Sequence, residues 1–268
     1  MAITEFDRVT LETEGAIATV RLNHPEVLNA TSRAMIDGLH SAVDAIEATK
    51  GEVRCVILTG SGRAFCAGAN LQDRRADAPP GHMPPPGASL ETVYHPLLRR
   101  LRGLPCPIVS AVNGAAAGVG MSLALMGDLI LAARSAYFLQ AFRRIGLVPD
   151  GGSTWLLPRR IGTARALELS LLGEKLPAET ALAWGLINRV CDDDKLMDEA
   201  RALAANLAAG PTVALNMTRQ LYWQSPDNSF EDQLNMECRS QIAAGRTADN
   251  KEGVQAFLEK RPARFQGR

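Results

Sequence analysis

Several features that would assign this chain of 268 residues to a special class of protein are missing. Its five cysteines are scattered, odd in number and without metal-ligand spacing, so we expect reduced thiols rather than a disulfide framework or a metal site. Neither sign of charge is in excess, since 29 Lys and Arg balance 29 Asp and Glu. The balance gives no support to nucleic acid or an anionic membrane as a partner.

Long apolar runs are missing as well. The best candidate, at 121–133, is interrupted by Gly127 and Asp128, so no segment is expected to span a membrane. The first eight residues carry two acids and no apolar stretch, which argues against a signal peptide. We therefore expect a cytoplasmic protein.

Nucleotide-binding signatures are also missing. The chain has no Gly-Lys-Ser/Thr phosphate loop. Gly118 and Gly120 lack the third glycine and the following acid of a dinucleotide site. We expect no cofactor and no metal.

What the chain does have is an alternation of strand-like and helix-like segments. The helix at 32–49 has Ser32 as its cap and Ile36, Leu39, Val43 and Ile46 on one face. The alternation predicts an α/β fold. The other segments expected in this part are strands at 9–12, 16–22, 53–59, 108–112, 129–132 and from 137, and a helix at 94–103.

The chain after residue 163 has almost no strand signal. Helices are expected at 178–184, 195–208, 230–244 and 249–260, each ended by glycine or proline. A proline-rich insert at 77–87 cannot be regular structure, and it is either a flap over a binding site or a plain surface loop.

Two glycine-rich turns, at 65–71 and 113–120, each follow a predicted strand. Small residues let bare backbone approach a ligand, and a helix that begins at such a turn leaves N–H groups without intrahelical partners. Two converging turns would offer two N–H donors to one oxygen, which is how an oxyanion is stabilised. Plain loops or a close helix contact are the alternative interpretation.

Five motifs resemble the enoyl-CoA hydratase/isomerase (crotonase) superfamily, in its order and across nearly the whole chain. They are LNHPEVLNA at 22–30, GRAFCAGANL at 62–71, AVNG at 111–114, GLVPDGG at 146–152 and AFLEKR at 256–261. The resemblance implies an α/β spiral of ββα units over 1–200 and a helical oligomerisation region over 201–268. It also implies trimers or dimers of trimers and acyl-CoA thioester substrates, with coenzyme A as part of the substrate.

Position by position, the resemblance assigns oxyanion donors and a coenzyme A site. The donors would be the backbone N–H groups of Ala69 and Val119. Main-chain groups of Val27 and Leu71 would contact the adenine and pantetheine, while Phe257 and Lys260 of a neighbouring subunit would contact the phosphate. The coenzyme A residues implied in this way are Glu26, Val27, Ala67, Leu71, Gln72, Phe257 and Lys260.

The two glutamates with which hydratases of this family activate water are missing. Ser122 and Phe142 occupy the matching positions, and neither can act as a general base at neutral pH. Hydration by the usual mechanism is therefore not expected.

One acid remains at a family position. Asp150, before Gly151 and Gly152, is a natural turn residue or helix cap. Isomerases of the superfamily, however, place a single acid there to move a proton between two carbons. Burial among Leu147, Val148 and Trp155 would raise its pKa towards a useful range.

His95 is a second candidate. A lone histidine is usually a surface or structural residue, and the same applies to His24, His40 and His82. In the 4-chlorobenzoyl-CoA dehalogenase branch, however, a histidine base matches His95 and a nucleophilic aspartate matches Asp150. Phe142 replaces the tryptophan that positions this nucleophile, which weakens the parallel.

The sequence thus predicts an acyl-CoA isomerase, most similar to the phenylacetate-pathway epoxide/oxepin-CoA isomerases and to the enoyl-CoA isomerases. It would shift a double bond, or isomerise a ring epoxide, through an enolate. Residual hydratase activity, dehalogenation and a non-catalytic acyl-CoA binder are the alternatives.

Overall fold

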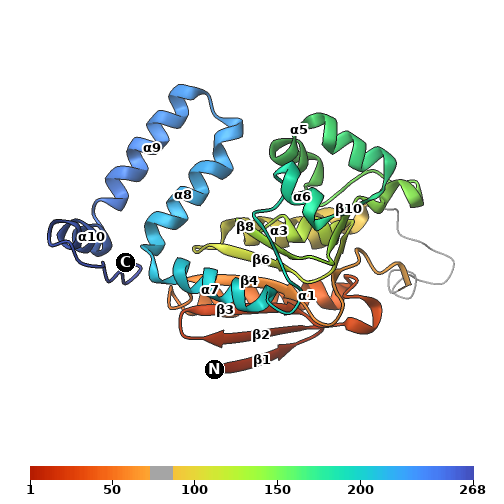
Figure 1. The fold of residues 1–268 in the computed structure, drawn as a ribbon, viewed down its shortest axis with the longest axis horizontal. Coiled ribbons are helices and arrows are strands. Elements are labelled where there is room, and N and C mark those ends of the chain that lie inside the picture. The colour runs from red at the N-terminus through yellow and green to blue at the C-terminus, as the bar shows by residue number, and fades with distance from the viewer. Residues whose placement is uncertain (73–86) are drawn as a thin grey trace.

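The fold is that of a computed structural model, which describes residues 1–72 and 87–268. Two sheets carry its strands (Figure 1). The larger sheet has the order β1-β2-β3-β4-β6-β8-β11 and the smaller one β10-β9-β7-β5. The larger sheet consists of β1 (Ala2–Phe6), β2 (Val9–Glu14), β3 (Ile17–Leu22), β4 (Cys55–Gly60), β6 (Ile108–Val112), β8 (Leu129–Ala133) and β11 (Arg189–Cys191). The smaller sheet consists of β5 (Ala64–Cys66), β7 (Ala115–Ala117), β9 (Tyr137–Leu139) and β10 (Lys175–Pro177).

The chain visits the two sheets in turn. It runs from β4 to β5, from β6 to β7 and from β8 to β9, and each pair adds parallel strands to both sheets before a helix follows. This is the predicted spiral of ββα units. The helices of this part are α1 (Arg33–Ala48), α3 (His95–Gly103), α4 (Val119–Ala124), α5 (Ser153–Leu172), α6 (Ala178–Trp184) and α7 (Leu196–Ala209).

Helices cover both faces of the larger sheet. Helix α1 begins as predicted, because the Ser32 hydroxyl accepts a hydrogen bond from the Met35 N–H at 3.2 Å. It packs closely on β2, where a methyl group on Gly38 would meet the Val9 side chain at 3.2 Å. Helix α7 lies on the opposite face. Side chains of a strand alternate between its two faces, so Glu12 of β2 points away from the face of Val9, and Arg201 of α7 lines a cavity together with Glu12.

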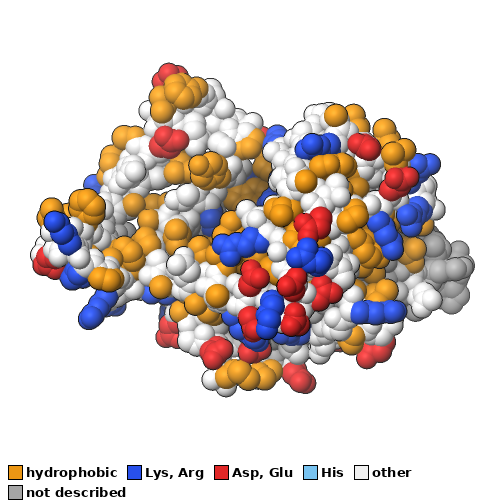
Figure 2. Space-filling view, viewed as in Figure 1, with side chains coloured by type: hydrophobic (Ala, Val, Ile, Leu, Met, Phe, Trp, Pro, Cys, Tyr) orange, Lys and Arg blue, Asp and Glu red, His pale blue; other side chains and the backbone are white. Residues whose placement is uncertain are grey.

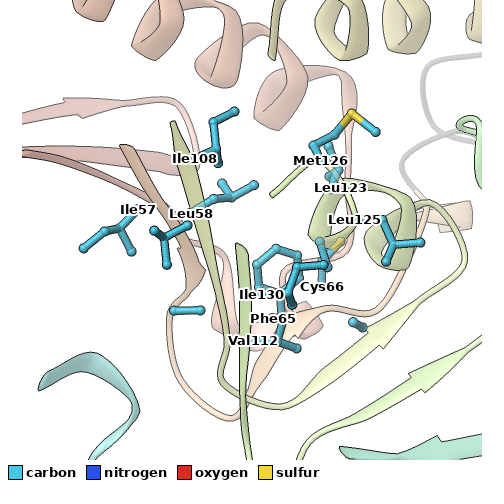
Figure 3. Packing of buried hydrophobic residues seen from close by; sticks show 14 of the residues in the cluster. Ile57, Leu58, Phe65, Cys66, Ile108, Val112, Leu123, Leu125, Met126 and Ile130 are labelled. Atoms are coloured by element: carbon cyan, nitrogen blue, oxygen red, sulfur yellow. The ribbon is translucent and has the colours of Figure 1, made fainter. Parts of the chain in front are cut away.

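The hydrophobic core lies between the sheets (Figure 3). Leu58 and Ile108 of the larger sheet are fully or almost fully buried, as is Phe65 of β5. Leu123 of α4 and Leu125 just after it fill the space next to them. The glycine-rich turns are therefore connected to close-packed strands and helices, and this packing restricts the conformations that their backbone can adopt.

The last helices form an arm that leaves the sheets (Figure 1). They are α8 (Thr212–Gln224), α9 (Phe230–Ala244) and α10 (Ala248–Leu258). The arm is attached through α8, where Arg219 pairs with Asp128 at 2.6 Å and the Trp223 ring stacks on Trp155 of α5 at 5.7 Å. Arg102 of α3 lies over both rings.

Large apolar side chains of the arm face outward (Figure 2). Tyr222 and Phe230 are 77% and 75% exposed, and Val254, Phe257 and Leu258 are exposed as well. An apolar surface of this kind is typical of a protein–protein contact.

Five strands were not predicted. Strands β5 and β7, of three residues each, overlap the two segments expected to be glycine-rich turns. Strands β10 and β11 lie in the part of the chain expected to lack strands, so that expectation is wrong. Each has three residues, too few for a period-2 pattern, and each exists because it pairs with β9 or β8. Strand β1 has almost no buried residue and is defined by its antiparallel pairing with β2.

The proline-rich insert predicted at 77–87 lies outside the described residues, except for Gly87. Within the described part of the chain, no helix is both long and apolar enough to cross a bilayer.

Candidate active site

The predicted site residues lie where three neighbouring parallel strands end. Strand β5 pairs with β7, and β7 pairs with β9, all in the same direction. The carboxyl ends of parallel strands meet at one edge of a sheet, so the segments that follow are neighbours. These are the first glycine-rich turn, the second turn with α4, and the short helix η3 (Ala141–Ile145) that leads to Asp150.

The two glycine-rich turns converge. A methyl group placed on Gly68 would lie 3.0 Å from the carbonyl oxygen of Ala117 and 3.9 Å from the Cα of Gly118. Both glycines have positive φ, 103° at Gly68 and 53° at Gly118, which L-residues rarely adopt. The backbones therefore come close here because Gly68 has no side chain, while Gly118 is required by its backbone conformation.

The N–H groups that follow these glycines are available to a ligand. Among the described residues, neither Ala69 N–H nor Val119 N–H has a hydrogen-bond acceptor. Val119 is the first residue of α4, whose first N–H groups have no partner within the helix. Val119 is buried and Ala69 is exposed, so the pair lies between the core and solvent.

The first turn is supported from both sides. Thr31 N–H donates to Gly68 O at 2.7 Å, and Asn70 N–H donates to Thr31 O at 2.7 Å. The Thr31 hydroxyl also shares a hydrogen bond of 2.9 Å with the hydroxyl of Tyr94. Tyr94 directly precedes α3, so the start of α3 lies beside this turn.

Five of the predicted coenzyme A residues lie in one region. The helix η1 (Pro25–Val27) contains Glu26 and Val27, and Ala67 N–H donates to Leu28 O at 3.0 Å just after it. Leu71 and Gln72 follow the same turn and are exposed.

The other two, Phe257 and Lys260, do not join them within one chain. Phe257 is on α10 and Lys260 follows it, at the outer end of the arm and away from α5 (Figure 1). Phe257 is 83% exposed. Within one chain these two residues therefore lie apart from the other five.

The main chain of Asp150 is held by two serines. Its carbonyl oxygen accepts the Ser122 hydroxyl at 3.1 Å, the Ser153 hydroxyl at 2.7 Å and the Ser153 N–H at 3.1 Å. The Asp150 side chain does not cap α5, since Gly152 is the N-cap residue and has no side-chain bond. The interpretation of Asp150 as a helix cap is therefore wrong.

Asp150 is half-buried, and one oxygen of its carboxyl is buried without a partner. Its Oδ1 has no hydrogen bond to any described residue. Loss of water around the carboxyl raises its pKa from 3.8 to about 6. Val148 was expected to lie in a buried cluster around this carboxyl, which is wrong, because Val148 is 80% exposed.

The two positions that match hydratase acids have other roles here. Ser122 is fully buried and bonds to the main chain of Asp150. Phe142, 7% exposed, packs its ring against the second turn, where a methyl group on Gly118 would lie 3.7 Å from its Cζ. Neither side chain could activate a water molecule.

His95 begins α3, as predicted, and is half-buried. Its neighbour Tyr94 ties the start of this helix to the first turn. Cys66, beside the turn, is fully buried, and this burial raises the pKa of its thiol to about 12. A thiolate nucleophile is therefore not available there.

Sequence reasoning missed the residues that support the site. Thr31, Tyr94 and Ser153 act through hydroxyl bonds to partners up to 63 positions away in the chain. Of these three residues, only Ser153 could have been found from local sequence, because a serine after two glycines is a common residue at the start of a helix. Bonds between distant segments leave no pattern in one sequence.

Comparison with known proteins agrees with this geometry. Residues 12–268 match the family model described as enoyl-CoA hydratase/isomerase. The chain is 48% identical over 255 residues to the 1,2-epoxyphenylacetyl-CoA isomerase of Escherichia coli, covering 95% of this chain and 97% of that protein. It is 44% identical to a probable enoyl-CoA hydratase of Rhodobacter capsulatus, covering 98% and 99% of the two chains.

Solved structures agree as well. The crystal structure of an enoyl-CoA hydratase from Bacillus anthracis superimposes with a TM-score of 0.90 at 29% identity, covering 97% of this chain and all of the other. The spiral, the paired turns and the helical arm are thus shared along the full length. The chain belongs to the enoyl-CoA hydratase/isomerase family.

Proposed function

We propose that this protein is an acyl-CoA isomerase in which Asp150 moves the proton. A single observation carries the proposal. Asp150, whose Oδ1 is buried without a partner and whose pKa is raised, lies in a loop tied to α4, the helix of the second turn, while Ser122 and Phe142 stand where the resemblance places the hydratase acids.

The reaction begins at the thioester carbonyl. Ala69 and Val119 N–H groups donate to its oxygen and stabilise the dienolate formed when Asp150 removes a proton from C2 of a 3-enoyl chain or, in the reverse direction, from C4 of a 2-enoyl chain. The protonated Asp150 then returns the proton to another carbon of the same chain. The double bond moves, no water is consumed, and no separate cofactor or metal takes part.

The substrate is an acyl-CoA, held by its adenine and pantetheine along Glu26, Val27, Ala67, Leu71 and Gln72. The similarity to the 1,2-epoxyphenylacetyl-CoA isomerase of Escherichia coli makes a ring epoxide of an aryl-CoA a second substrate to test.

We propose further that the protein works as a trimer or a dimer of trimers. The exposed apolar side chains of α8–α10 support an assembly, and Phe257 and Lys260 need a neighbouring subunit to reach a coenzyme A phosphate.

The test is to incubate the purified protein with a 3-enoyl-CoA and to follow conjugated 2-enoyl-CoA. We expect turnover that rises with pH through about pH 6, since the carboxylate is the proton acceptor. Asp150→Asn should lower kcat by about 10²- to 10⁴-fold, the range for loss of a general base. Wild-type rates in this variant would exclude Asp150 from the reaction.

The alternatives give different results. A hydratase would convert crotonyl-CoA to the 3-hydroxy product, and a dehalogenase would release chloride from 4-chlorobenzoyl-CoA and lose this activity in His95→Gln. A non-catalytic binder would be stabilised against heat by acyl-CoA without forming any product.

A further inference from the structure

The Ser122 hydroxyl connects two elements of the site. It belongs to α4 and donates at 3.1 Å to the carbonyl oxygen of Asp150, in the loop before α5. The other two donors to this oxygen both come from Ser153 of α5 itself. The Ser153 bonds close the first turn of α5, and only the Ser122 bond ties this carbonyl to α4.

Packing at the next residue strengthens this connection. A methyl group on Gly151 would lie 2.8 Å from both Cβ and Oγ of Ser122 and 3.3 Å from a methyl carbon of Val119. The Gly151 backbone therefore lies directly against the side chains of α4. The helix that presents the Val119 N–H is also the surface on which the Asp150 loop rests.

We propose that Ser122 is a positioning residue, which holds the Asp150–Gly151 peptide on α4 and so sets the place of the carboxyl relative to the Val119 N–H. The inference rests on the proposed function of Asp150 and deepens it. In this family member, the position of a hydratase acid is used to align the remaining acid.

Loss of the Ser122 hydroxyl should change both the position of the Asp150 carboxyl and its exposure to water. Without the Ser122 hydroxyl, the Asp150 carbonyl keeps its bonds within α5, so the loop stays folded but can shift on α4. A shift moves the carboxyl away from the enolate and lets water reach Oδ1. Catalysis should fall, and the carboxyl should become easier to ionise.

The test compares Ser122→Ala with Thr59→Val. Thr59 is also fully buried and its hydroxyl donates to Ala111 O at 2.8 Å, so the control loses the same kind of bond between β4 and β6. We expect kcat for 3-enoyl-CoA to fall about five- to twentyfold in Ser122→Ala with KM within about twofold, as for one misaligned group. Thr59→Val should keep the wild-type kcat.

A second measurement does not depend on activity. The Asp150 carboxyl carbon is followed by ¹³C NMR during a pH titration and identified by its loss in Asp150→Asn. Its midpoint should be lower in Ser122→Ala than in wild type and unchanged in Thr59→Val. An unchanged midpoint in Ser122→Ala would overturn the inference, as would equal kcat values in the two variants. Because the titration needs no turnover, it decides the role of Ser122 even if the isomerase assay fails.

Discussion

At the scale of the residue, Asp150 combines two properties that oppose each other. Its loop is tied to α4 through Ser122, yet its carboxyl Oδ1 has no hydrogen bond to any described residue, and burial raises the pKa of the carboxyl to about 6. A carboxylate is less stable in such a place than in water. The burial that would let Asp150 act as a base near neutral pH, as proposed, therefore lowers the stability of the fold.

This opposition predicts that Asp150→Asn is more stable than wild type at pH 8. A carboxyl whose pKa is raised on folding lowers stability as pH rises from about 4 through about 6, and an amide has no such charge. After a discount for partial exposure, we expect a gain of about 1–2 kcal/mol in the free energy of unfolding. Urea unfolding at pH 8 and pH 4 measures it.

The two proteins should converge near pH 4, where both side chains are neutral. A variant that is less stable than wild type at pH 8 would contradict the assignment of Asp150 as a poorly solvated acid.

Gly118 carries the second residue-scale prediction. Its φ of 53° and ψ of −128° direct the following N–H, and an added methyl group would meet only ordinary contacts, at 3.7 Å and beyond. Gly118→Ala should therefore change the backbone rather than the packing. We expect a stability loss of about 1–3 kcal/mol and a fall in kcat of about 10²-fold, since one oxyanion donor turns away.

Gly15→Ala is the matched control for this variant. Gly15 has nearly the same φ, 56°, in the turn between β2 and β3, with nothing within 4 Å of an added methyl group. It should lose stability but keep wild-type kcat. Equal activities in the two variants would show that Gly118 has no role in catalysis.

At the scale of the element, α8 attaches the helical arm to the larger sheet. Arg219 is 7% exposed, its Nε lies 2.6 Å from an Asp128 oxygen, and its Nη1 donates to Leu104 O. Asp128 in turn accepts the Ile108 N–H at 2.7 Å. One buried ion pair thus ties α8 to the start of β6.

Arg219→Ala should accordingly lower the free energy of unfolding by about 3–5 kcal/mol, because it leaves the Asp128 charge without its partner. The exposed pair of Arg33 and Asp37, 2.8 Å apart, provides the comparison, and Arg33→Ala should cost about 0.5 kcal/mol or less. Thermal and urea unfolding measure both. Similar losses in the two variants would contradict this role of α8.

At the scale of the whole molecule, the residues that the resemblance assigns to coenzyme A fall in two separate places. Residues 26, 27, 67, 71 and 72 lie near the first turn, whereas Phe257 and Lys260 lie at the outer end of the arm. If these two bind the coenzyme A phosphate, each site draws on two subunits.

Hybrid oligomers test this arrangement. Asp150→Asn and Lys260→Ala chains are mixed in equal amounts, unfolded and refolded together. A site with the Asp150 of one chain and the Lys260 of its neighbour is intact, so about a quarter of the sites should regain wild-type kcat/KM by random pairing. If Lys260 serves its own chain, no hybrid exceeds the parent variants. Chains refolded separately and then combined are the control.

Much of the fold follows from local pattern. The cap at Ser32, the apolar face of α1 and the strands that lead to the two turns depend on residues close together in the chain, so periodicity predicted them. The short strands β10 and β11 depend on pairing with strands far away in the chain, so no local pattern predicted them.

For the site, the sequence by itself determined which groups are available: one acid at Asp150, no hydratase acids, and glycines that leave two turns bare. Only the tertiary structure decided how these groups are used. It removed water from the Asp150 carboxyl, tied its carbonyl to Ser122, and separated Phe257 and Lys260 from the rest of the site. The reason is physical, because solvation and alignment depend on which distant segments pack around a group.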